Sequence, residues 1–219
     1  MNQEVTKYKF KSVLQSLAQG VAAGVCIGIG TITNLISSNK YVGALLFSIG
    51  LYLVCCYQLK LCTGMAGYVL SSSSPVDLTV AAIGNVVGIS FTYILAVLWN
   101  PLVRNMSEVV LFEKLDRQPY QIFISAIFCG MLMFLAVDRF KKSQHPVTKL
   151  LGIFLCIPCF VLNGFDHCVV NMFYVLSSES LQVGIFGLIM FGISMLGNFI
   201  GAIFAWVLFQ KINFWNIKD

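Results

Sequence analysis

Long apolar runs alternate with short polar interruptions along the whole chain. A helix needs about 20 apolar residues to cross a bilayer, so two of the runs, 61–70 and 168–176, are too short to cross alone. Each follows a longer run after a polar stretch, QLKLCTG in one case and NGFDHC in the other. The pattern predicts six membrane spans, with the second and fifth broken in the middle. The apolar runs cover residues 13–36, 41–59, 61–70, 76–99, 119–138, 147–162, 168–176 and 183–210.

The composition agrees with a membrane protein. Of the 219 residues, 58% are hydrophobic and 11% are charged, and the mean hydropathy is +0.85, whereas soluble domains are about 25% charged. The first residues, MNQEVTKYKFK, are polar and basic, and the apolar run behind them is too long for a signal peptide. The net charge of +5 is spread over several loops, so it bears on topology and gives no reason to expect a nucleic-acid partner.

Lysine and arginine residues set the expected orientation, because cytoplasmic loops are enriched in them. With both termini inside, nine basic residues lie on the cytoplasmic side and four lie outside. We therefore expect a multi-pass protein of the cell (inner) membrane with cytoplasmic N- and C-termini. The inner set is Lys7, Lys9, Lys11, Arg139, Lys141, Lys142, Lys149, Lys211 and Lys218, and the outer set is Lys40, Arg104, Lys114 and Arg117.

The two halves of the chain resemble each other. GNVVG (84–88) lies in the third span and GNFIG (197–201) in the sixth, and the broken second span matches the broken fifth. A repeat of three spans is odd in number, so its second copy must be inverted, and the broken helices of such repeats meet near the bilayer midplane. We expect an all-α membrane protein with one transmembrane channel domain over 1–219, built from repeats at about 11–99 and 117–210. Close helix packing alone would also explain the glycines.

The two breaks indicate a pore or cavity, because unwound backbone inside a membrane is tolerated only where protein or water covers it. The half-helices that restart near Thr63 and Cys168 would direct free N–H groups and positive dipole ends toward that space, which attracts anions. The alternative is that both breaks are irregularities of packing.

Several motifs resemble the formate/nitrite transporter family. GFDHCVVNMF (164–173) resembles its GFEH-x-x-ANMF signature, and LKLCTG (59–64) resembles its ELFTG or DLFTS stretch. GNVVG and GNFIG match its two Gly-Asn motifs, and FLAV before Asp138 matches the end of its fourth span. The resemblance runs from about Lys11 to Phe209. It implies an aquaporin-like protomer, a homopentamer with one pore per protomer, and passage of small monovalent weak-acid anions such as formate, nitrite or hydrosulfide.

The resemblance also implies roles for single residues. The central histidine falls on His167 and the pore threonine on Thr63. The acidic neighbour, Asp166, and Asn171 would support the helix break. The implied apolar constrictions are Leu51, Phe160, Phe47 and Leu61, and the implied basic vestibule residues are Lys11 and Lys114.

Three positions depart from the family pattern. Lys60 stands where the family has an acid, Gly130 where it has an asparagine, and Asp138 where it has a tryptophan. A lysine at this depth must pair, reach the surface or line water. Lys60 therefore either adds positive potential to a vestibule, or has a structural role in which it reaches the membrane surface or pairs with Asp77 or Asp138. Gly130, as a small pore-facing residue, would alter the pore.

A central histidine makes chemical sense for a weak acid. An anion that crosses about 30 Å of hydrocarbon faces a large desolvation cost, whereas the neutral acid does not. Histidine titrates near physiological pH, so we expect His167 to exchange a proton with the passing acid. Thr63 would donate a hydrogen bond to the anion or orient the ring. Asp166 is placed to cap the following half-helix. The alternative for His167 is a buried ring satisfied by a backbone carbonyl.

A rival interpretation is a membrane-embedded thiol redox or metal-binding protein that uses the cysteines of CIPC (156–159). An apolar helix interior disfavours the reactive thiolate, which argues against it. A third possibility, a water or neutral-solute channel, would not need His167. Walker A and GxGxxG motifs are absent from the sequence, so we expect neither an ATP-driven pump nor a cofactor or metal, and no enzymatic activity. The eight cysteines are Cys26, Cys55, Cys56, Cys62, Cys129, Cys156, Cys159 and Cys168.

Overall fold

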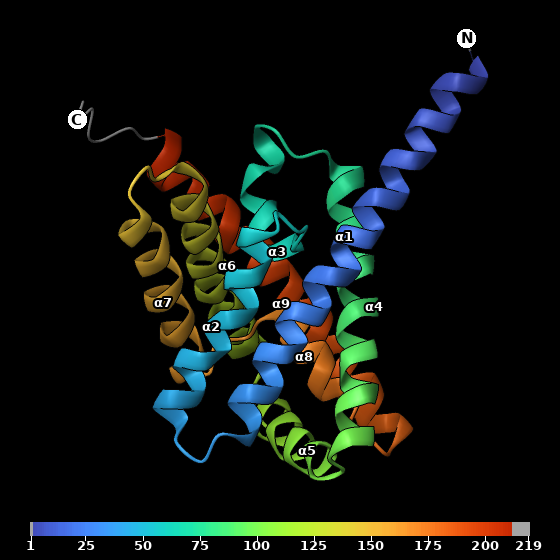
Figure 1. Cartoon of the computed structure of the whole chain (residues 1–219). Coiled ribbons are helices and arrows are strands. Elements are labelled where there is room, and N and C mark those ends of the chain that lie inside the picture. The colour runs from blue at the N-terminus through green and yellow to red at the C-terminus, as the bar shows by residue number, and fades with distance from the viewer. Residues whose placement is uncertain (1, 212–219) are drawn as a thin grey trace.

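The computed structural model describes residues 2–211, with side chains from Ser12 to Phe209. This part of the chain is almost wholly helical (Figure 1). Its elements in order are α1 (Asn2–Ile36), α2 (Lys40–Cys56), α3 (Cys62–Met65), η1 (Ala66–Leu70), α4 (Pro75–Trp99), α5 (Leu102–Leu115), α6 (Pro119–Lys142), α7 (Pro146–Leu162), α8 (Cys168–Val175), α9 (Leu181–Trp206) and η2 (Val207–Lys211).

Within the described residues, four helices are long and apolar enough to cross a membrane: α1 from Ser12, α4, α6, and α9 extended to Phe209. Two further apolar helices, α2 and α7, have 17 residues each. Helix α2 ends at Cys56 before α3 begins at Cys62, and α7 ends at Leu162 before α8 begins at Cys168. The chain therefore leaves the helical conformation at the two polar stretches that interrupt its apolar runs.

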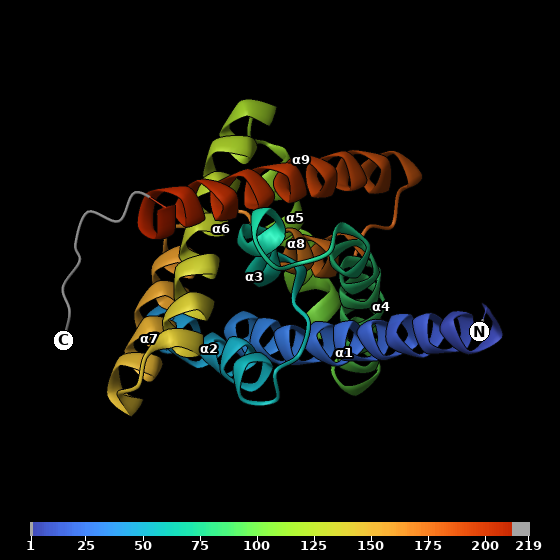
Figure 2. The ribbon, with the colours of Figure 1, turned by 90° about the horizontal axis from the view of Figure 1, so that it is seen from above.

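The long helices enclose the short ones. Helix α1 packs along α4, α6 packs along α9, and α2 packs against α7. Seen from above in Figure 2, α3 and α8 lie in the middle, with α1 on one side and α9 on the other. The start of α1 and the end of α9 lie on the same side of the bundle, and α5 lies on the opposite side (Figure 1).

Glycines allow the backbones of the long pairs to touch. A Cβ atom on Gly88 would lie 2.0 Å from the carbonyl oxygen of Val21, and one on Gly201 would lie 2.0 Å from that of Ile127. Only a residue without a side chain fits at such a crossing. The Gly-Asn motifs therefore have the predicted packing role, the first between α1 and α4 and the second between α6 and α9.

Gly130 belongs to the same kind of contact. A Cβ atom there would lie 2.0 Å from the carbonyl oxygen of Asn198, so α6 and α9 meet backbone to backbone at this point. The interpretation of Gly130 as a small pore-facing residue is therefore wrong. Its missing side chain is required by helix packing and does not widen a pore.

Helix α5 is an element that the apolar pattern did not predict. It buries Val103, Ser107, Leu111 and Lys114, which follow one another at intervals of about one helical turn. One face of α5 therefore packs on the bundle, where the helix contacts α8. This packing brings Lys114 to the second helix break.

Candidate functional site

The two helix breaks have the same backbone geometry. Gln58 and Gly164 each stand two residues after a helix end, with φ of 52° and 64°. In each turn a further backbone hydrogen bond closes the helix end. It runs from Leu59 N to Val54 O at the first break and from Phe165 N to Phe160 O at the second break. Both α2 and α7 thus end in a Schellman-type turn. Glycine adopts the left-handed conformation without steric cost, so Gln58 is the more strained of the two.

Asn85 fixes the first break. Its side-chain oxygen accepts a hydrogen bond from the backbone N–H of Cys62 at 2.8 Å. Its amide nitrogen donates to the carbonyl oxygens of Gly20 at 2.9 Å and Lys60 at 2.8 Å. The side chain is fully buried. One amide in α4 therefore satisfies the start of α3, the loop before it and a carbonyl of α1.

Asn198 makes the matching set of bonds at the second break. Its side-chain oxygen accepts from the N–H of Cys168 at 2.8 Å, and its amide nitrogen donates to the carbonyl oxygens of Ala126 at 2.8 Å and Asp166 at 2.7 Å. Sequence reasoning named the Gly-Asn motifs but assigned the asparagines no role. Their matched places in two apolar spans were the available signal.

Thr63 and His167 meet where the two half-helices begin. Thr63 Oγ1 lies 3.0 Å from His167 Nε2, and both side chains are buried. His167 Nδ1 accepts a hydrogen bond from the backbone N–H of Val170 at 3.3 Å. Because Nδ1 is an acceptor, we assign the proton of the neutral ring to Nε2, which faces Thr63. His167 is thus held by its own half-helix and presents one nitrogen to the other break.

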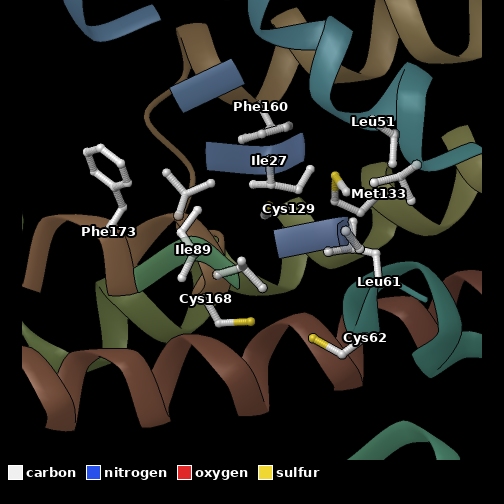
Figure 3. Packing of buried hydrophobic residues seen from close by; sticks show 14 of the residues in the cluster. Ile27, Leu51, Leu61, Cys62, Ile89, Cys129, Met133, Phe160, Cys168 and Phe173 are labelled. Atoms are coloured by element: carbon white, nitrogen blue, oxygen red, sulfur yellow. The ribbon is translucent and has the colours of Figure 1, made fainter. Parts of the chain in front are cut away.

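The four residues expected to form apolar constrictions are all buried: Leu51, Phe160, Phe47 and Leu61. Phe160 stacks on the ring of His167 with centroids 5.9 Å apart. Phe47 meets Phe160 edge to face at 5.5 Å. Leu51, Leu61 and Phe160 belong to one cluster of buried hydrophobic residues, part of which is shown in Figure 3. The histidine therefore adjoins, through Phe160, a buried apolar cluster with side chains from α2, α7 and the first break.

Asp166 gathers four donors in a fully buried position. Its carboxylate accepts from Lys114 Nζ at 2.7 Å, from Arg117 Nη1 at 3.1 Å and from Asn171 Nδ2 at 3.1 Å. The hydroxyl of Ser125 also donates to it. The loop before α8 is therefore tied to α5, α6 and α8 through one carboxylate.

The expectation that Asp166 caps the second half-helix is wrong. The N-cap is His167, whose ring accepts the N–H of Val170. The carboxylate of Asp166 points to the cationic groups of α5 and of the α5–α6 connection instead. This difference makes the histidine a structural element of the break as well as a candidate for proton exchange.

Lys114 was expected in a basic vestibule, and the structure places it in a buried ion pair. Its side chain is 8% exposed, and Asp166 is its partner. Burial lowers the pKa of the Lys114 ammonium, and the adjacent carboxylate opposes that shift. Arg117 reaches the same carboxylate and also donates to the carbonyl oxygen of Gly164 at 3.2 Å. Two cations and one carboxylate therefore stand beside His167.

Asn171 supports the second break from inside α8. Its amide nitrogen donates to Asp166 and to Ser194 Oγ at 3.2 Å. Its side-chain oxygen is buried and has no hydrogen-bond partner among the described residues. An acceptor of this kind is available to a water molecule or to a protonated acid.

A cavity of about 710 Å³ is lined mainly by the end of α2, the first break, the end of α6 and the start of α7. Leu61 and Gly64, which precede and follow Cys62 and Thr63 in the sequence, are among the residues that line it. The cavity therefore reaches the first helix break. Its lining includes Val54, Cys55, Cys56, Gln58, Leu59, Lys60, Leu61, Gly64, Met65, Ser73, Val137, Phe140, Lys141 and Lys149.

Lys60 is paired at the edge of this cavity. Its Nζ lies 3.4 Å from Asp77 Oδ1 and donates to Ser16 Oγ at 2.6 Å. This geometry agrees with the structural interpretation of Lys60, in which the lysine forms an ion pair, and the partner is Asp77. Asp138 is engaged elsewhere, by the hydroxyl of Tyr68 at 2.8 Å and by Lys142 at 2.8 Å.

The remaining candidates are less informative. The side chain of Lys11 lies outside the described residues. Cys156 and Cys159 of the CIPC stretch are unpaired thiols on α7, and Cys159 is exposed. Between Ser12 and Phe209, no group of three or more histidine, cysteine, aspartate or glutamate side chains is arranged to hold a metal ion.

The sequence comparison settles the family. The model of the formate/nitrite transporters matches residues 1–212. The chain belongs to the formate/nitrite transporter family. It is 26% identical over 186 residues to the formate channel FocA of Haemophilus influenzae, covering 73% of this chain and 65% of that protein. It is 29% identical over 153 residues to the uncharacterised transporter YrhG of Bacillus subtilis, covering 64% and 58%. The matched part is thus less than two thirds of either relative.

Solved structures of the family share the fold. A pentameric formate channel with formate bound has a TM-score of 0.69 at 21% identity, covering 94% of this chain and 97% of that one. An ion channel of the family has a TM-score of 0.69 at 20% identity, covering 96% and 91%. The predicted resemblance is confirmed, and the chain is a multi-pass membrane protein. The relatives named here are channels and transporters, as expected for a protein that is not an enzyme.

Proposed function

We propose that this protein is a channel for small monovalent weak-acid anions of the formate, nitrite or hydrosulfide type in the cell (inner) membrane, with cytoplasmic termini. The observation that carries the proposal is the buried Thr63–His167 contact of 3.0 Å at the start of two half-helices. It joins a titratable ring and a hydroxyl at the edge of a buried apolar cluster, with the ion pairs of Asp166 on the other side of the ring. A similar structure is described as a pentameric formate channel with formate bound, which supports a homopentamer with one pore per protomer.

The proposed architecture is one domain over 1–219 made of two inverted three-span repeats, at about 11–99 and 117–210. Two observations support it. Each break has five residues between its helices, with the left-handed residue in second place. Each break is also held by an asparagine from the last helix of its half, through the N–H of Cys62 or Cys168. By this equivalence, Leu61 is the counterpart of His167.

The proposed path runs from the cavity past the central pair. An anion on the cytoplasmic side enters the cavity, where Lys60, Lys141 and Lys149 provide positive potential. Leu51 and Leu61 form the inner apolar collar, and Phe47 and Phe160 form the outer one. Thr63 and His167 lie between the two collars. A charged solute would pay for desolvation at both collars, whereas a neutral acid would not.

The central pair supplies the proton in this proposal. In the neutral ring, Nε2–H donates to Thr63 Oγ1, which leaves the threonine hydroxyl free to donate to an anion. A proton that reaches His167 is passed to the anion, and the neutral acid leaves through the next collar. The neighbouring cluster of Lys114, Arg117 and Asp166 has a formal charge of +1. The positive charge of this cluster attracts the anion. It also disfavours a lasting positive charge on the neighbouring His167 ring.

A proteoliposome flux panel tests the proposed function. Uptake of formate, nitrite, hydrosulfide and lactate is measured at two pH values, with protein-free liposomes as the control. We expect protein-dependent uptake of small weak-acid anions that rises at the lower pH. Uptake no faster than in protein-free liposomes for every anion would overturn the proposal, and the ranking of the four anions would identify the substrate.

A further inference from the structure

Cys62 and Cys168 stand at equivalent positions, as the first residues of α3 and α8. Asparagine side chains fix the backbone N–H of both. Both thiols are free and buried, each residue being 1% exposed. Figure 3 shows their sulfur atoms directed toward one another across the gap between the two half-helices. The fold thus brings together two thiols that are 106 positions apart in the sequence.

No cluster of three or more potential ligands exists in the described part of the chain. His167 adjoins Cys168, but its ring nitrogens are engaged by Val170 N and by Thr63 Oγ1. Zinc requires about four ligands. Soft ions of the copper(I) type prefer thiolates and need only two of them in a line.

We propose that Cys62 and Cys168 form a two-thiolate site for a soft, linearly coordinated divalent metal ion of the Hg²⁺ type. Metal binding displaces the thiol protons. With mercuric chloride, two S–H bonds and two Hg–Cl bonds break and two S–Hg bonds form, which releases two protons and two chloride ions. The product is an uncharged S–Hg–S bridge, so its formation places no net charge among the buried apolar side chains.

A metal bridge at this position would affect anion transport. Cys62 precedes Thr63 and Cys168 follows His167 in the sequence, so the bridge would tie together the two segments that supply the central pair. Two segments joined by a metal ion cannot move apart. We therefore expect metal binding to block anion flux, and this second part rests on the proposed channel function.

The site is tested with mercuric chloride, which is uncharged and reaches the membrane interior. The background protein carries Cys56→Ser and Cys159→Ser, which removes the two exposed cysteines. Bound mercury is counted by native mass spectrometry of purified full-length protein, and free thiols are titrated in parallel. In the background protein we expect one bound mercury ion per chain that a monothiol does not remove. We also expect the number of free thiols per chain to fall by two.

Single substitutions decide whether the two thiols act together. Cys62→Ala and Cys168→Ala, each in the background protein, should both lose the monothiol-resistant mercury while keeping the thermal unfolding temperature. Cys156→Ala is the matched control and should keep it. Equal retention of mercury in either of the first two variants would overturn the site.

Flux measurements separate the site from the proposed function. Anion uptake by the background protein should stop on addition of mercuric chloride and return with a dithiol, whereas the Cys168→Ala protein should be unaffected. Absence of uptake before mercury is added would contradict the channel function and leave the metal count as the test of the site. Full uptake with mercury bound would overturn the blocking role.

Discussion

Thr63 Oγ1 lies 3.0 Å from His167 Nε2, and this contact joins residues 104 positions apart in the sequence. Both partners belong to a helix break, since Thr63 stands in the first turn of α3 and His167 is the N-cap of α8. The contact exists because α2 and α7 end in matching turns and their short successors meet in the middle of the bundle. The proposed proton exchange therefore depends on two irregular segments held by long helices.

The hydroxyl of Thr63 should be required for anion flux. Thr63→Val keeps the shape of the side chain and removes the group that meets His167 and the anion, whereas Thr63→Ser keeps the hydroxyl. A hydrogen bond to a charged group contributes about 1.5–3 kcal/mol, so the valine variant should lose at least about tenfold in uptake rate. The serine variant should stay close to the unmodified protein in the same proteoliposome assay. Equal rates for the valine and serine variants would show that the hydroxyl takes no part.

Asp166 should be important for stability because it neutralises a buried lysine. Asp166→Asn leaves Lys114 facing an uncharged amide, and removal of one partner from a buried pair costs about 3–5 kcal/mol. Arg117 is partly exposed, so most of the loss comes from Lys114. The double variant Asp166→Asn with Lys114→Met should regain part of the stability. The measurement is the midpoint of thermal or denaturant unfolding in detergent.

An exposed ion pair supplies the control for Asp166. Arg104 and Glu179 lie 3.0 Å apart with side chains 44% and 65% exposed, and exposed pairs contribute about 0–1 kcal/mol. Glu179→Gln should therefore hardly change the unfolding midpoint. A similar small effect for Asp166→Asn would mean that the buried cluster does not stabilise the second break.

Lys60 and Asp77 should have opposite effects on anion entry from the cavity side. Asp77→Asn removes the carboxylate 3.4 Å from Lys60 Nζ and leaves an uncompensated cation, so uptake should rise about twofold at low ionic strength. Lys60→Gln should lower it by a similar factor, and the double variant should resemble the unmodified protein. All differences should shrink near 1 M salt, where the Debye length is about 3 Å. Differences that persist at high salt would exclude an electrostatic origin.

Substitution by alanine should have different effects on stability at two glycines of α9. Gly201→Ala places a Cβ atom 2.0 Å from the carbonyl oxygen of Ile127, whereas a Cβ atom on Gly192 meets no atom within 4 Å. Overpacking costs about 1–3 kcal/mol, so Gly201→Ala should lower the unfolding midpoint in detergent. Gly192→Ala should leave it unchanged or raise it slightly. Tolerance of alanine at position 201 would contradict the close contact between α6 and α9.

Much of the fold could be predicted because membrane-spanning helices are visible in the sequence as long apolar runs. Apolar runs of sufficient length can only be spans, and the two runs that were too short marked the breaks. The position of Thr63 near His167 followed from the matching breaks. The packing glycines were also visible, since GNVVG and GNFIG repeat the same spacing in two apolar segments.

The rest depended on contacts that no local pattern records. The buried cation that pairs with Asp166 is Lys114 of α5. This helix has a mixed polar composition and gives no long apolar run, and Lys114 is 52 positions away from Asp166 in the sequence. Gly130 seemed to face the pore because a motif match fixes a position along a helix but does not fix its direction. The bonds of Asn85 and Asn198 to the breaks likewise require the folded chain.

The most direct test of the central claim is the proton uptake that accompanies formate uptake in proteoliposomes, recorded with an internal pH indicator for the unmodified protein and for His167→Asn. Asparagine keeps a polar group for Thr63 and for the N-cap but does not titrate. If His167 transfers the proton, the unmodified protein should take up about one proton with each formate, with a rate that rises as pH falls. The variant should lose this coupling. Coupling of the same size and pH dependence in the variant would contradict the account.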